Sequence, residues 1–94
     1  MNKTIIENKE KKLELVLAIL TQAIEISNNT SADIFTDYFS HVNGFNVRTY
    51  WNGWGKDEKV DINTTVYIDQ DCIETLENIL NQFNKYIEEE MKWI

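Results

Sequence analysis

VNGFNVRTYW, residues 42–51, is the stretch that decides the fold. Asn43 and Gly44 are the residue types that most readily take the positive φ angles of a two-residue type I′ turn. Beyond them, apolar and polar side chains alternate, and one side of the chain carries Phe45, Val47, Thr49 and Trp51. Such alternation is typical of a strand with one buried face. The stretch therefore predicts a β-hairpin with a tight turn at residues 43–44.

Residues 33–42, which precede the turn, fit two structures. Their apolar side chains would line one face of a helix formed by Ile34, Phe35, Tyr38, Phe39 and Val42. The hairpin turn instead requires a partner strand here, so we predict a strand, with the helix as the alternative. After a loop at residues 52–57, alternation returns in a third strand. One of its faces carries Val60, Ile62, Thr64, Val66 and Ile68, and the other carries Asp61, Asn63, Thr65 and Tyr67.

Residues 4–27 predict a long helix with two apolar rows at helical spacing. One row consists of Leu13, Leu17, Leu20 and Ile24; the second consists of Leu15, Ile19 and Ile26, with Val16 and Ala23 between the two. A helix that is apolar around most of its circumference is buried on more than one side. Two interpretations stay open: a central core helix, or a helix that also lines a homodimer interface.

The last predicted element is an amphipathic helix that runs nearly to the C-terminus. Asp71 and Glu74 stand at the spacing of a capping box, with Asp71 as the capping residue. Apolar side chains then recur every three or four residues, at Ile73, Leu76, Leu80, Phe83, Ile87, Met91 and Ile94. The order of elements is thus α-β-β-β-α. We predict one α+β domain over residues 1–94, with a three-stranded antiparallel sheet and two helices packed on one of its faces.

The charge of the chain is unevenly distributed. Residues 1–32 carry four Lys and four Glu, whereas residues 33–94 carry five basic and twelve acidic side chains and hold the whole net charge of −7. Because nucleic-acid affinity depends on Lys and Arg, direct binding of DNA or RNA is disfavoured, and a protein with a basic surface is the favoured partner. The sequence contains no apolar run of about 20 residues and no secretion signal, so we expect no membrane partner and a cytoplasmic location in a bacterial host.

Residues that carry chemistry are scarce. Cys72 is the only cysteine and His41 the only histidine, so the chain lacks the ligands of a zinc site. These two residues could form a nucleophile–base pair, but the sequence indicates no third residue that would orient the base. The sequence Asp69-Gln70-Asp71 does not continue into a calcium loop. We therefore expect no enzyme activity, no metal and no cofactor.

The sheet face turned away from the helices is the more informative feature, because aromatic residues and an arginine on an open face are typical of an interaction patch. A one-residue error in strand register would exchange the two faces. We predict that a protein partner is bound by Phe39, Arg48, Tyr50, Trp54, Asp61, Tyr67, Asp69, Glu74 and Glu77.

Two resemblances bear on function. The element order resembles the double-stranded RNA-binding domain, but residues 69–74 are acidic where that family has lysines, so we exclude its function. Residues 41–43, 47–50, 53–54 and 66–69 resemble a loose pattern in small phage and prophage proteins. Size, acidity and a composition typical of AT-rich genomes also resemble phage-encoded anti-defence proteins, including anti-CRISPR proteins.

This class-level resemblance implies an inhibitor whose acidic surface blocks a nucleic-acid-binding groove of a CRISPR-Cas effector. The alternatives are a structural or regulatory homodimer built on residues 4–27, and an immunity protein that neutralises a toxin.

Overall fold

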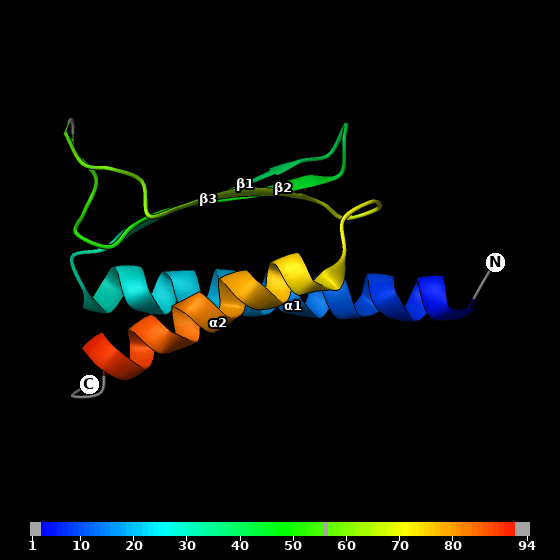
Figure 1. Ribbon diagram of the computed structural model, residues 1–94, viewed down its shortest axis with the longest axis horizontal. Coiled ribbons are helices and arrows are strands. Elements are labelled where there is room, and N and C mark those ends of the chain that lie inside the picture. Colours follow the sequence, from blue (N-terminus) through cyan, green and yellow to red (C-terminus); the bar gives the residue numbers. More distant parts are fainter. Residues whose placement is uncertain (1–2, 56, 92–94) are drawn as a thin grey trace.

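The computed structural model describes the backbone of residues 3–55 and 57–91 and the side chains of residues 9–55 and 57–91. Its elements are α1 (Lys3–Asn29), β1 (Asp33–Phe39), β2 (Gly44–Tyr50), β3 (Ile62–Tyr67) and α2 (Ile73–Glu90), shown in Figure 1. The predicted α+β fold, with the order α-β-β-β-α, is confirmed. No described helix is long and apolar enough to cross a membrane.

The three strands form one antiparallel sheet in the order β1-β2-β3. On β2, Phe45, Val47 and Thr49 are buried under the helices, whereas Arg48 between them points to the opposite face. The pairings Thr36–Val47 and Val47–Thr64 extend this inner face across the sheet. The alternation predicted from the sequence is therefore present in all three strands.

The hairpin turn differs from the prediction. Residues 33–39 form a strand rather than a helix, but β1 pairs Phe39 with Gly44, so that four residues, 40–43, connect the strands instead of two. Asn43 has a positive φ of 51°, as the turn signal requires, while Gly44 begins β2. The observed pairing is displaced by four residues from the predicted one. Because four is even, every side chain keeps the predicted face.

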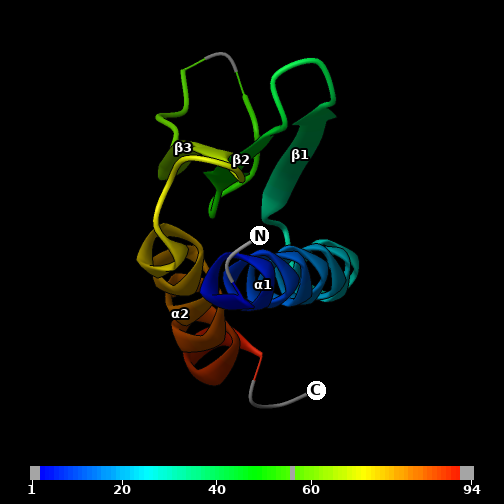
Figure 2. The same cartoon turned by 90° about the vertical axis from the view of Figure 1, so that its right-hand side faces the viewer.

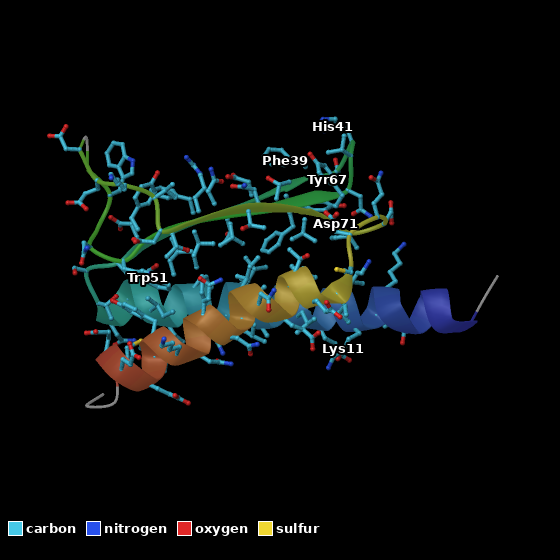
Figure 3. All side chains as sticks on the ribbon, in the orientation of Figure 1. Lys11, Phe39, His41, Trp51, Tyr67 and Asp71 are labelled. Carbon is cyan, nitrogen blue, oxygen red and sulfur yellow. The ribbon has the colours of Figure 1, made fainter. Side chains whose placement is uncertain are left out.

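Both helices lie side by side on the inner face of the sheet (Figures 1 and 2). The buried side of α1 carries Leu15, Ile19, Ala23 and Ile26, which meet Leu76, Ile79 and Phe83 of α2 in the same core. The Gln22 side chain donates a hydrogen bond of 2.6 Å to Asn84 across the two helices. Trp51 lies at one end of the molecule (Figure 3), where its ring stacks on the Tyr86 ring of α2 at a centroid distance of 4.1 Å.

The row of Leu13, Leu17, Leu20 and Ile24 lies largely outside this core. Leu13, Leu17 and Ile24 are 47%, 63% and 62% exposed, and Leu20 is half-buried. We call these four residues the α1 stripe. The expectation that α1 is buried on more than one side is thus not met within a single chain.

The predicted capping box at the start of α2 is wrong. Cys72 occupies the N-cap position without a side-chain cap, and the Asp71 carboxylate instead accepts a 2.7 Å hydrogen bond from the Tyr67 N–H at the end of β3. The carboxylate therefore stabilises the turn between β3 and α2 and does not cap the helix. The helix extends to Glu90 with Met91 as its C-cap, and Ile94 lies outside the described residues.

Candidate protein-binding face

The sheet face away from the helices, here called the outer face, is covered by no described element (Figure 2). The strand register places on it Phe35, Asp37, Phe39, Asn46, Arg48, Tyr50, Asn63, Thr65 and Tyr67. Four of the predicted binding residues, Phe39, Arg48, Tyr50 and Tyr67, are among them. The outer face thus combines aromatic rings, amides and one arginine on a surface open to solvent.

The end of the outer face near the hairpin loop is built around a glycine. Gly44 pairs with Phe39 on one side and with Tyr67 on the other, so the three residues form one row across the sheet. A Cβ atom on Gly44 would lie 3.4 Å from the Tyr67 ring, which shows that the ring lies over the glycine backbone. Phe39 and Tyr67 are 42% and 40% exposed, and both lie at this end in Figure 3.

A second group of side chains occupies the same face nearer the start of β1. The Phe35 ring packs edge to face against Tyr50, with centroids 6.0 Å apart and planes inclined by 86°. The Arg48 guanidinium lies 5.2 Å from the centre of the Phe35 ring, within the range of a cation–π contact. This contact holds the guanidinium of the only arginine against the sheet, where a binding partner can reach it.

Asn46 ties the middle of the outer face together. Its side-chain amide donates to the Thr65 hydroxyl at 2.9 Å and to the Thr64 carbonyl at 3.2 Å. Both acceptors belong to β3, so the amide links two strands on the exposed side.

Acidic residues lie in the two loops at opposite ends of the outer face. This acidic rim consists of Asp57, Glu58 and Asp61 in the loop after β2, and of Asp69 and Asp71 in the turn after β3. The Asp61 carboxylate accepts a 2.8 Å hydrogen bond from the Trp51 backbone N–H, while the Asp69 side chain is exposed. Lys56 and Lys59 offset part of the charge in the first loop, so residues 51–61 carry a net charge of −1 and residues 68–72 carry −2. Both ends of the outer face are therefore acidic, the turn after β3 more strongly.

Trp54 lies in the loop after β2 and has the most exposed ring among the large apolar side chains of the described chain, at 64%. The Trp54 backbone N–H donates a 2.7 Å hydrogen bond to the Asp33 carboxylate at the start of β1. Gly53, with φ 91°, makes the turn before it, and a Cβ there would come within 3.1 Å of the Ser31 carbonyl oxygen. The loop is thus anchored beside the end of the outer face that carries Tyr50.

The remaining predicted residues, Glu74 and Glu77, lie elsewhere. Both are exposed on α2, which belongs to the helix layer on the other side of the sheet (Figure 1). The structure therefore divides the predicted binding residues between two surfaces of the molecule. A rigid partner docked flat on the outer face would not meet these two glutamates.

The two residues with reactive side chains are not assembled into a site. Cys72 is exposed at the start of α2, with its sulfur 3.9 Å from the Thr75 hydroxyl, and His41 is exposed in the hairpin loop. Within residues 3–55 and 57–91, no hydrogen bond joins them, and no group of three His, Cys, Asp or Glu residues is placed to hold a metal ion.

Phe35 and Asn46 also lie on the outer face, although they are not among the predicted binding residues. Their contacts with Arg48 and Thr65 depend on the cross-strand partners, which the alternation pattern does not define.

Comparison with known proteins identifies no relative. No family model matches the chain, and no curated protein or solved structure is significantly similar to it.

Proposed function

We propose that this protein is a non-enzymatic inhibitor that binds another protein through the outer face of its sheet. The observation that carries the proposal is the outer face itself, where the exposed Phe39 and Tyr67 and the half-buried Arg48 lie between two acidic loops. Trp, Tyr and Arg dominate the energetic centres of protein interfaces, and polar residues surround them.

The charge of the chain indicates what kind of partner this face fits. A net charge of −7 repels phosphate backbones and attracts basic protein surfaces. In the concrete form of the proposal, the acidic rim occupies a groove that normally binds nucleic acid, and the aromatic centre supplies the desolvated contact. The proposed target is a CRISPR-Cas effector, as the class-level resemblance to anti-CRISPR proteins suggests.

The test is capture of the partner by tagged protein from lysates of a CRISPR-bearing bacterium, at low salt and at about 0.5 M salt, where charges are screened beyond a few ångströms. Captured effector is then assayed for target cleavage with added inhibitor. Two matched charge reversals locate the surface: Asp69→Lys alters the acidic rim, and Glu77→Lys makes the same change on the helix layer. A double variant, Phe39→Ala with Tyr67→Ala, removes the two exposed aromatic rings at the hairpin end of the outer face.

We expect a salt-sensitive effector in the eluate, lost with the aromatic double variant and weakened by Asp69→Lys but not by Glu77→Lys. Equal weakening by both reversals would contradict the choice of face. An effector that binds yet cleaves its target normally would contradict inhibition, and a toxin captured by the same face would identify an immunity protein instead.

A further inference from the structure

The α1 stripe is an aliphatic surface that a single chain leaves largely open within the described residues. Leu13, Leu17 and Ile24 are each about half or more exposed, at 47%, 63% and 62%. At about 100° per residue, the stripe is rotated by about 135° around the helix axis from the buried residues Leu15, Ile19, Ala23 and Ile26. The stripe therefore belongs to the helix layer, and Leu13, Leu17 and Ile24 point away from the core, whereas Leu20 packs partly against it.

An apolar groove extends the same surface towards the sheet. It encloses a volume of about 400 Å³ between α1, the hairpin and the turn after β3, and its lining includes Leu13, Val16, Leu20, Tyr38, Phe45 and Ile68. Two stripe residues, Leu13 and Leu20, thus border both the groove and the open side of α1. Stripe and groove together form one continuous apolar surface.

We infer that this surface is covered by a second copy of the chain, with the two α1 helices packed antiparallel about a two-fold axis. The stripe is symmetric about its midpoint between residues 18 and 19. In an antiparallel pair, Leu13 therefore faces the partner's Ile24, and Leu17 faces the partner's Leu20. The spacing of four, three and four residues matches the seam by which helices pack side by side.

Charge favours a second copy at this site and selects the antiparallel direction. Two chains of net charge −7 repel each other least where the local charge sums to zero, and residues 1–32 are that region. In the antiparallel pair, the exposed Lys9 lies opposite the partner's Asn28, and Glu10 opposite the partner's Ser27. A parallel pair would instead place Lys9, Glu10 and Glu14 each against its own copy, and like charges at such positions repel.

The pairing leaves the proposed function intact, since the stripe and the outer face lie on opposite layers of the molecule (Figure 2). This inference goes beyond the proposed function and stands without it, because partner binding requires the outer face of only one copy.

The interface is small, since the stripe is about 16 Å long at 1.5 Å per residue. Sedimentation equilibrium of the full chain from about 10 µM to about 1 mM covers the range expected for weak contacts of this size. We expect a monomer–dimer equilibrium that Leu17→Glu weakens at least about tenfold, since the new carboxylate would be buried at the contact. The matched control is Val60→Glu, which puts the same group on an exposed loop valine and should leave dimerisation unchanged.

The direction of pairing is tested with a spin label at Ser27→Cys in a Cys72→Ser background. Antiparallel helices place the two labelled positions about 25 Å apart along the axis, whereas parallel helices hold them about 10 Å apart. A monomer up to 1 mM, or a dimer indifferent to Leu17→Glu, would overturn the inference, and the short distance would overturn the antiparallel arrangement. Circular dichroism of Leu17→Glu verifies that the variant folds, and unchanged capture of the proposed target separates the two hypotheses.

Discussion

The two apolar rows of α1 have similar compositions and opposite environments. Leu15, Ile19, Ala23 and Ile26 are at most 7% exposed, whereas Leu13, Leu17 and Ile24 in the other row are at least 47% exposed. The exposed row holds no smaller side chains than the buried one. Composition therefore does not decide which row enters the core. The geometry of the layer decides it, because the sheet and α2 together can cover only one side of a helix at its edge.

The largest expected effect comes from truncating one residue in each row. Ile19→Ala removes a side chain that is 0% exposed and should lower the free energy of unfolding by about 2–5 kcal/mol, the usual range for a large-to-small change in a core. Leu17→Ala, at 63% exposure, should change it by less than about 1 kcal/mol. Urea denaturation at low micromolar concentration, where the proposed weak dimer is expected to dissociate, measures both. Equal losses would mean that the monomer buries both rows.

The contrast between these rows marks a boundary of what the sequence predicts. The spacing of leucines and isoleucines predicted the helix and both of its rows, because that pattern depends only on 3.6 residues per turn. It did not predict which row is buried, because that depends on where α2 and the sheet lie. The faces of the strands were predicted correctly despite an incorrect turn, since the four-residue displacement preserves the alternation.

Two details depend on contacts distant in sequence or on competing local bonds. Asp71 has the spacing of a helix cap, but its carboxylate instead accepts a hydrogen bond from the Tyr67 backbone N–H at the end of β3. The predicted binding set joined Asp61 and Asp69 with Glu74 and Glu77, because acidity alone cannot separate the two layers. The packing of α2 against the inner face carries the two glutamates to the other side of the sheet.

The same comparison applies to the two faces of the sheet, with a smaller expected effect. The Thr49 hydroxyl on the inner face is buried and, among the described residues, has no hydrogen-bond partner. Thr49→Val should therefore raise the free energy of unfolding by about 1 kcal/mol, since an unpaired buried polar group is removed. Thr65→Val on the outer face removes the acceptor of the 2.9 Å bond from Asn46 and should lower stability slightly. Thermal unfolding of both variants checks the sign, and a loss with Thr49→Val would mean that its hydroxyl is hydrogen-bonded in solution.

The smallest expected effect on stability concerns Arg48. Arg48→Met keeps an unbranched apolar chain over the Phe35 ring and removes the charge, so it should lower the free energy of unfolding by only about 0.5 kcal/mol, as for a solvent-accessible cation–π contact. Binding of the proposed partner should fall much more, because an arginine at the centre of an interface contributes more than one on a free surface. Urea denaturation and titration calorimetry with the captured partner give the two values. A loss of stability without a loss of affinity would assign Arg48 to the sheet alone and would move the binding centre towards Phe39 and Tyr67.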